Sequence, residues 1–196
     1  MTPQNAITTA RDIINDTDPA AYRQSNDEMV RYYNDGLREI STLAPQLFVS
    51  TGDMQCAPAA TEQGIAFADA QLLADVVRVK AGRAVLPCDM TTLSAFNPNW
   101  GQDVAAEAVN WFRHASDPLR FYIYPQSPVD QVLEVKYYRS PAVVALTDSV
   151  TDIPQSMEPA MVNYLVYRAE MKDDEHVNSG RSVASYQAFL ALVKPA

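Results

Sequence analysis

Few residues of this chain could do chemistry, and the first of them form a short acidic string. Asp16, Thr17 and Asp18 begin like a calcium-binding loop, in which oxygens at alternate positions ligate the ion. The loop motif continues with an acidic or amide residue and then a glycine, but Ala20 and Ala21 occupy those two positions. An acidic turn at the end of a helix is the better interpretation, so we predict no metal ligand here.

The two histidines are the next candidates, because histidine is the commonest general base. His114 precedes Asp117 in a turn-rich segment, and His176 follows the acidic run 173–175. A general base needs an oriented partner and a pocket, and the sequence indicates neither. Solvated turns are the favoured interpretation of both histidines. A small cytoplasmic enzyme or ligand-binding module that uses the His114–Asp117 turn is the alternative from another functional class.

Motifs for a nucleophile or a nucleotide are missing from the chain. Cys56 and Cys88 are the two cysteines, and neither stands in a local Cys-His signature or suggests a disulfide. The sequence contains no G-x-S-x-G, no P-loop and no G-x-G-x-x-G string. Its 6 glycines disfavour loops that cradle phosphate. We therefore predict no catalytic residue, no cofactor and no enzymatic activity.

The net charge of the chain limits the kinds of molecule that it is expected to bind. The chain of 196 residues has a formal net charge of −9 and a pI near 4.6. Tight binding to nucleic acid needs clustered Lys and Arg, whereas a negative wall around a channel would keep DNA from sticking. The sequence does not open with a basic region and an apolar core, and no apolar run approaches the roughly 20 residues that span a bilayer. We expect neither a signal peptide nor a membrane segment.

Residues 1–45 have the pattern of two helices that are joined by a tight acidic turn. Pro19 should end the first helix, because proline lacks a backbone donor and restricts the residue before it. Ser25 and Glu28 form an S-x-x-E capping box, which predicts the start of the second helix. The apolar face expected on the first helix consists of Ala6, Ile7, Ala10, Ile13 and Ile14.

The second helix has a clearer apolar stripe, which consists of Met29, Tyr33, Leu37, Ile40 and Ala44. Gly36 costs a helix about 1 kcal/mol relative to alanine, which suggests that another backbone approaches it closely. Pro45 marks the end of the helix pair. A short amphipathic helix does not hide its stripe alone, so we expect the two helices to pack on each other or on the rest of the fold.

The middle of the chain has the pattern of several short strands. Residues 46–64 are predicted to be a loop, and Thr91 or Thr92 should cap a short helix that ends at Phe96. The predicted strands are 65–67, the later part of 72–80, 84–86, 108–112, 120–124 and 132–138. Of these, 108–112 and 120–124 should form a hairpin.

Two more helices are expected toward the end of the chain. Pro159 fits the first turn of the earlier helix. The later helix should end before Pro195, with an apolar face made of Val183, Tyr186, Gln187, Leu190 and Val193. The predicted fold class is α+β. Helices from 1–45 and 155–196 should form a small bundle, with a β-rich antiparallel region at 46–154.

Aromatic and basic side chains on these elements are candidates for contacts between subunits. A tyrosine ring buries area while its hydroxyl still finds a partner, although tyrosines that fill the domain's own core explain the pattern equally well. Arginines on helices could pair across subunits, but more often they are solvated or form exposed pairs worth about 0–1 kcal/mol. The candidate subunit-interface residues are Arg31, Arg38, Tyr122, Tyr124, Arg168 and Arg181.

Six strings of the chain resemble, in the same order, strings of the head-to-tail adaptor (connector) proteins of tailed bacteriophages. They are RDIINDTD (11–18), YNDGLREI (33–40), FNPNW (96–100), DPLRFYIYP (117–125), PAMVNYLVYRA (159–169) and SYQAFL (185–190). Together they span nearly the full length of the chain. Residues 46–90 match poorly, so this region should be the most particular to this phage.

The resemblance implies a structural protein of the virion neck. Such adaptors look like rings, usually of twelve subunits, that sit below the portal, extend the DNA channel and offer a surface to the next tail or neck protein. The implied partners are other copies, the portal and that next component, while DNA passes without sequence-specific binding. Assembly would take place in the host cytoplasm. In related connectors the chain ends dock into the portal, which makes Val193, Lys194, Pro195 and Ala196 candidate portal-docking residues. A stopper or tail-terminator protein is the alternative within this class.

Overall fold

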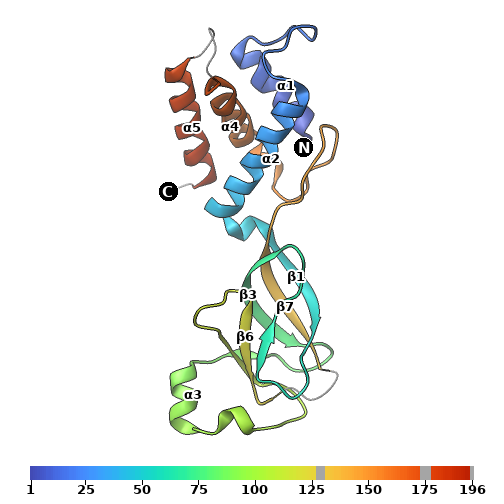
Figure 1. The fold of residues 1–196 in the computed structure, drawn as a ribbon, viewed down its shortest axis with the longest axis vertical. Helices are drawn as coiled ribbons and strands as arrows, with labels where there is room; N and C mark the ends of the chain where they lie inside the picture. Colours follow the sequence, from blue (N-terminus) through green and yellow to red (C-terminus); the bar gives the residue numbers. More distant parts are fainter. Residues whose placement is uncertain (127–130, 173–177, 195–196) are drawn as a thin grey trace. The chain divides into compact units, whose positions relative to one another are not determined.

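The computed structural model describes residues 1–126, 131–172 and 178–194 of the chain. The chain forms two compact units, one of Met1–Phe48 with Pro141–Ala196 and the other of Val49–Ser140. Figure 1 shows that the first unit is helical and combines the two ends of the sequence, whereas the second is built from strands. The predicted α+β fold class is confirmed.

The helical unit contains four long helices among its described residues. They are α1 (Pro3–Ile14), α2 (Asn26–Leu43), α4 (Glu158–Glu170) and α5 (Ser179–Val193), with short turns η1 (Pro45–Phe48) and η3 (Gln155–Met157). The predicted cap of α2 is confirmed, because the Ser25 hydroxyl accepts a hydrogen bond from the Glu28 backbone N–H at 3.2 Å. Pro159 lies in the first turn of α4, as predicted. Side-chain caps at Thr2, Ser25 and Asn178 fix the starts of α1, α2 and α5, whereas α4 begins without one.

The apolar stripe predicted on α2 is confirmed, since Met29, Tyr33, Leu37, Ile40 and Ala44 are all buried in the core of the helical unit. On α1 the prediction is wrong at Ile13, which is 47% exposed. Arg11 and Ile13 flank the α1 stripe on opposite sides at 100° per residue. The fold covers the Arg11 side, so the arginine is buried and the isoleucine is not.

Gly36 is closely approached, but by side chains and not by a backbone. A Cβ atom at Gly36 would stand 2.8 Å from Cδ1 of Tyr164 and 3.0 Å from Cε of Met161, both on α4. The expectation of a neighbouring backbone is therefore wrong. Glycine lets the Tyr164 ring lie flat on α2 at this crossing.

The face predicted for α5 is also wrong in part. Val183 is 64% exposed and Gln187 is exposed, whereas Ser182, Ser185, Phe189 and Val193 are the buried residues of the helix. The Phe189 ring lies 5.0 Å from the Tyr164 ring on α4. Contacts with α4 decide the face, since Phe189 packs on Tyr164 and the Ser182 hydroxyl donates to the Tyr167 carbonyl at 3.4 Å.

The segment 141–154, which we had expected in the β-rich region, lies in the helical unit. The Asn34 side chain on α2 donates to the Val144 carbonyl at 3.0 Å and accepts from the Val144 N–H at 2.9 Å. The Gln4 N–H donates to the Leu146 carbonyl at 3.0 Å. Backbone groups of an irregular segment need such partners, and here α1 and α2 supply them.

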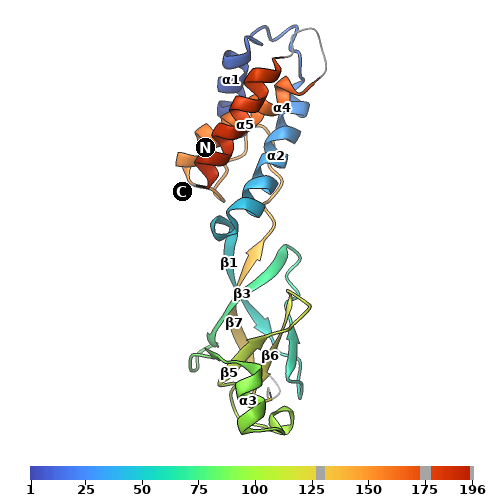
Figure 2. The ribbon, with the colours of Figure 1, turned by 90° about the vertical axis from the view of Figure 1, so that its left-hand side faces the viewer.

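The second unit holds two sheets, which Figure 2 shows from another side. Their strand orders are β1-β7-β3 and β2-β6-β5-β4, with every pair antiparallel except β4 with β5. The strands are β1 (Val49–Gln55), β2 (Glu62–Gly64), β3 (Ala70–Val79), β4 (Leu86–Pro87), β5 (Asn110–Arg113), β6 (Arg120–Tyr124) and β7 (Val132–Arg139). The short helix α3 (Met90–Phe96) and turn η2 (Trp100–Gln102) connect β4 to β5.

Strong alternation was a reliable guide to these strands. The β5–β6 hairpin is confirmed, and Leu133, Val135 and Tyr137 of β7 are buried as predicted. The loop predicted over 46–64 is wrong, because it contains β1 and β2, and 65–67 is not a strand. The sequence of β1, VSTGDMQ, has no alternation of apolar and polar residues, so pairing with the distant β7 defines the strand. The cap of α3 is Asp89, whose carboxylate accepts from the Thr92 N–H at 2.8 Å, and not a threonine.

Candidate interaction surfaces

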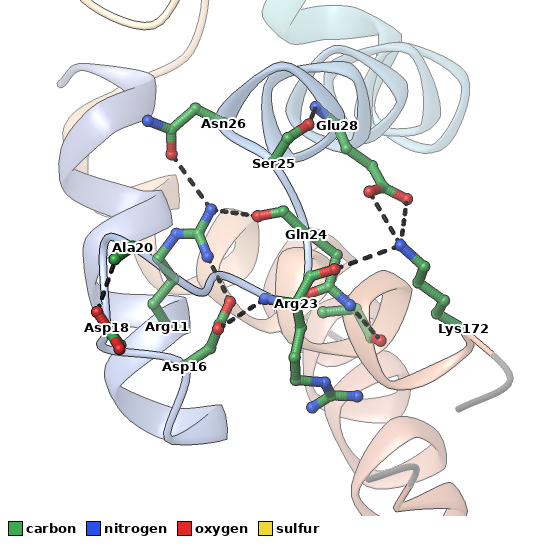
Figure 3. A network of polar contacts seen from close by, with 11 residues as sticks. Arg11, Asp16, Asp18, Ala20, Arg23, Gln24, Ser25, Asn26, Glu28 and Lys172 are labelled. Carbon is green, nitrogen blue, oxygen red and sulfur yellow. Dashed lines mark hydrogen bonds and ion pairs between the residues drawn. The ribbon is translucent and has the colours of Figure 1, made fainter. Parts of the chain in front are cut away.

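The acidic string between α1 and α2 is part of a buried polar network. Arg11 and Asp16 form an ion pair in which each side chain is only 4% exposed. Arg11 Nη2 also donates to the Gln24 carbonyl at 2.6 Å and to Asn26 Oδ1 at 3.2 Å (Figure 3). The Tyr22 ring lies 3.5 Å from the guanidinium carbon. A desolvated charge needs such compensation, and these contacts hold the turn in one conformation.

The same network joins the α1–α2 turn to the end of α4. The Gln24 side chain donates to the Ala169 carbonyl at 3.1 Å. Lys172 Nζ approaches Glu28 Oε2 at 3.1 Å and the Arg23 carbonyl at 3.4 Å (Figure 3). These contacts hold the α1–α2 turn against α4, which is a structural role.

The carboxylates of Asp16 and Asp18, which resembled the start of a calcium loop, bind groups of the same chain. Asp16 Oδ2 meets Arg11, and its Oδ1 accepts from the Arg23 N–H at 2.9 Å. Asp18 Oδ1 accepts from the Ala20 N–H at 2.9 Å, which closes the exposed part of the turn. In the ranges 1–126, 131–172 and 178–194, no group of three or more His, Cys, Asp or Glu side chains could hold a metal ion.

The four candidate interface arginines have different surroundings. Arg31 and Arg38 are exposed on α2, and Arg38 pairs with Asp35 of the same helix at 2.8 Å. Arg168 of α4 reaches the other oxygen of Asp35 at 3.2 Å and lies 4.8 Å from the Tyr32 ring centre. Arg168 therefore joins α4 to α2 within one protomer.

Arg181 also makes contacts within the protomer. It pairs with Glu170 of α4 at 3.0 Å, and the Glu170 side chain is only 1% exposed. Its guanidinium donates to the Ile13 carbonyl at 3.3 Å, at the end of α1. The arginine thus joins α1, α4 and α5 and neutralises a buried carboxylate.

The two candidate interface tyrosines lie in an aromatic and polar cluster on the outer face of the second sheet. The Tyr122 ring stacks on Phe112 with centroids 5.1 Å apart, and Trp100 packs edge-on at 6.1 Å. The Tyr124 hydroxyl donates to Asp103 Oδ2 at 2.9 Å. Both tyrosines are half-buried in their own protomer.

His114 acts as a turn acceptor in the structure. Its Nδ1 accepts backbone hydrogen bonds from Ser116 at 3.3 Å and Asp117 at 3.0 Å, and its ring stacks on Tyr122 at 5.5 Å. Asp117 Oδ1 accepts from the Leu119 N–H at 2.9 Å. The turn's own backbone therefore takes up His114 Nδ1 and Asp117 Oδ1. His176 lies outside the described residues.

Tyrosine hydroxyls in the helical unit have raised pKa values. Burial raises the pKa of Tyr33 above its ordinary value and that of Tyr164 to about 12. The pKa of Tyr186 rises to about 12, chiefly because its hydroxyl donates to Glu39 Oε1 at 2.6 Å. Because each pKa is higher in the folded than in the unfolded state, the protonated hydroxyl stabilises the folded form.

These shifts predict that the helical unit loses stability in alkali. The unfolded tyrosines have a pKa of about 10, so their contribution is fully present below about pH 10 and is lost as the pH rises toward 12. Denaturant titrations followed by circular dichroism at about pH 8 and about pH 11 measure the loss. Tyr186→Phe should show a smaller alkaline loss than the wild type, with Tyr138→Phe in the other unit as the control. An equal loss in wild type and Tyr186→Phe would contradict the assignment to Tyr186.

Several apolar side chains are exposed, among them Ile13 and Val183, which the sequence pattern had placed on buried helix faces. In the second unit α3 buries none of its residues, and Phe96 is 87% exposed beside Met90 at 46%. In the helical unit Val183 and Leu192 on α5 and Ile13 on α1 are exposed. A count of charges on each helix face would have found α5, because its exposed residues include no Asp, Glu, Lys or Arg.

The candidate docking residues at the chain end divide into three cases. Val193 is 3% exposed in the core of the helical unit, so it offers no surface while α5 is folded on α4. Lys194 is exposed. Pro195 and Ala196 lie outside the described residues.

Comparison with protein-family models finds a match over almost the whole chain. A family model described as SU10 adaptor protein matches residues 1–194. No curated protein matches. Among the described residues, no helix combines the length and the apolar character that crossing a membrane requires.

Proposed function

Because this chain belongs to the SU10 adaptor protein family, and so is a structural head-to-tail adaptor of a phage virion, we propose that its copies form a ring that joins the portal to the tail and extends the DNA channel. The match over residues 1–194 carries this proposal, because it covers both units. The ring belongs to the virion neck, is assembled in the host cytoplasm and, by resemblance to related adaptors, contains twelve copies. Its partners are the portal and the next tail or neck protein, and it needs no catalytic activity.

The charge of the chain supports the proposed channel. A formal net charge of −9 per copy makes a ring of such chains strongly negative. A negative lumen repels the DNA phosphates, so DNA passes without sequence-specific binding. A protein that acts through its surfaces can use its polar side chains to stabilise its own turns. Asp16, Asp18 and His114 do so, since each is hydrogen-bonded to groups of its own turn.

Electron microscopy of the chain mixed with its portal tests the proposal. We expect a closed ring seated on the portal, with a central channel wide enough for DNA. A chain that stays monomeric and separate from the portal at every concentration tried would overturn the proposal.

We further propose that the portal is contacted by the end of the chain, at Pro195 and Ala196, which lie outside the described residues. Removing residues 195 and 196, which keeps Lys194, should weaken attachment to the portal, measured by co-sedimentation, and should leave the melting temperature unchanged. A longer deletion of 187–196 also removes Phe189 and Val193, which are buried, so it would damage the bundle as well. Undiminished attachment of the short truncation would show that the portal binds elsewhere.

A further inference from the structure

Two helices of the helical unit present outer faces that carry almost no charge. The exposed residues of α5 are Ser179, Gly180, Val183, Ala184, Gln187, Ala191 and Leu192. Those of α1 are Gln4, Asn5, Thr8, Thr9, Asp12 and Ile13, of which only Asp12 is charged. By contrast, α2 exposes the charged residues Asp27, Arg31 and Arg38. A helix face that meets only water ordinarily carries charges, so the faces of α1 and α5 fit a protein partner better than solvent.

An open groove lies beside α1. It has a volume of about 480 Å³ and runs between Thr9 of α1 and the first turns of α4, where Pro159, Val162 and Asn163 line it. Gln155, Ser156 and Glu158 also line it. Ile13, one turn beyond Thr9, extends the apolar surface along α1. The groove therefore has apolar surface at Pro159 and Val162 among polar side chains, one of which, Glu158, is acidic.

The groove and the α5 face lie on different sides of the helical unit, so the groove of one copy could receive the α5 face of another. Figure 1 shows α4 between α5 and α1 in the helical unit. A ring is built from heterologous contacts, in which one surface of a subunit meets a different surface of the next. Two faces that carry few charges, one on either side of α4, meet this requirement.

The two surfaces also lie at the same level along the bundle. On the antiparallel helices α4 and α5, the ring centres of Tyr167 and Tyr186 lie 4.6 Å apart and those of Tyr164 and Phe189 lie 5.0 Å apart. Each residue toward the start of α4 therefore lies level with one residue further toward the end of α5. Continuing this register places Lys194 level with Pro159, next to Glu158.

Glu158 and Lys194 have opposite charges. Within the described part of the chain neither side chain makes a hydrogen bond or ion pair, and the Glu158 charge acts on the Tyr33 hydroxyl, whose pKa it helps to raise. The contact inferred below takes the ring axis to run along the bundle, so that rotation moves a subunit sideways and leaves its level unchanged. The lysine at the end of one α5 face then comes opposite the glutamate that lines the neighbour's groove.

We propose that the exposed face of α5 of one copy packs into the groove between α1 and α4 of the next copy, with Lys194 against the neighbour's Glu158. This inference rests on the proposed ring and names the surfaces that close it. The other helix with an exposed face, α2, keeps its charges toward solvent or toward another partner.

Disulfide trapping tests the contact. Thr9→Cys and Gln187→Cys are made in separate, differently tagged chains with Cys88→Ser as background, because Cys56 is buried and Cys88 is the more accessible native cysteine. Mixed with the portal under oxidising conditions, the two chains should form a mixed disulfide dimer several-fold more than either chain alone forms a dimer with itself. The control pair is Arg31→Cys with Gln187→Cys, since Arg31 is exposed on α2, outside the contact.

The outcomes separate this inference from the proposed function. A ring seen by microscopy, with trapping no greater than in the control pair, would overturn the α5–groove contact and leave the adaptor ring standing. Self-trapping of Gln187→Cys alone would mean that equal faces meet, which also overturns it. Failure to form any ring would overturn the proposed function together with the inference.

Charge reversal gives a second and independent readout. Glu158→Lys should raise the concentration needed for ring assembly by about two- to five-fold, as for an exposed ion pair. The double variant Glu158→Lys/Lys194→Glu should restore assembly, because every interface then holds the reversed pair. A double variant that assembles no better than Glu158→Lys would show that these two residues do not meet between copies.

Discussion

Leu37→Asp should lower the free energy of unfolding of the helical unit by about 4 kcal/mol or more. Leu37 is 1% exposed, in the middle of the buried stripe of α2. Truncating a buried leucine alone costs about 2–5 kcal/mol, and the new carboxylate would have to be buried or be neutralised by a shifted pKa. Thermal and denaturant unfolding followed by far-ultraviolet circular dichroism measures the loss.

The matched control for this variant is Thr42→Asp, which adds the same side chain at an exposed position near the end of the same helix. It should cost no more than about 1 kcal/mol, because it only opposes the helix dipole. If Leu37→Asp melted at the wild-type temperature, the assignment of this face to the core would be wrong.

Asp16→Ala should be nearly as damaging, with a loss of about 3–5 kcal/mol. The substitution leaves the Arg11 guanidinium buried without its counter-ion, since the Arg11 side chain is only 4% exposed. It also removes the acceptor for the Arg23 N–H. The remaining contacts of Arg11 to Gln24, Asn26 and Tyr22 do not carry a negative charge. Denaturant unfolding of the purified chain measures the difference.

Two further variants make this prediction specific to the ion pair. Asp18→Ala removes an exposed carboxylate from the same turn and should cost about 1 kcal/mol or less, so it controls for damage to the turn. Arg11→Met/Asp16→Leu removes both charges and should be markedly more stable than Asp16→Ala, since a buried pair replaced by apolar groups leaves no isolated charge. Equal losses in Asp16→Ala and Asp18→Ala would show that the buried pair contributes little.

Several elements of the fold could be predicted from local sequence pattern. The apolar stripe of α2 and its Ser25 cap were predictable, because a helix repeats every 3.6 residues and a cap acts within one turn. The alternation in β7 and the β5–β6 hairpin were predictable for the same reason, since neighbours in sequence define them. The family resemblance added the adaptor class, which the match over residues 1–194 confirms.

The surfaces of the molecule were much less predictable. Arg168 and Arg181 look like free surface cations in the sequence, but Asp35 and Glu170 pair with them in the folded protomer. Ile13 looks like a core residue, yet the fold covers the Arg11 side of α1 instead. In each case the deciding partner lies on another element, where no local spacing reports it.

By itself the sequence determined the helices, the stronger strands, the α+β class and the absence of catalytic motifs, because capping, periodicity and motif spacing act over a few neighbouring residues. Only the tertiary structure decided which side of α1 and α5 is buried, that β1 exists and that the acidic turn holds a buried arginine. Those features depend on pairing between distant segments, and the free energy of such pairing comes from desolvation and packing that no single segment contains.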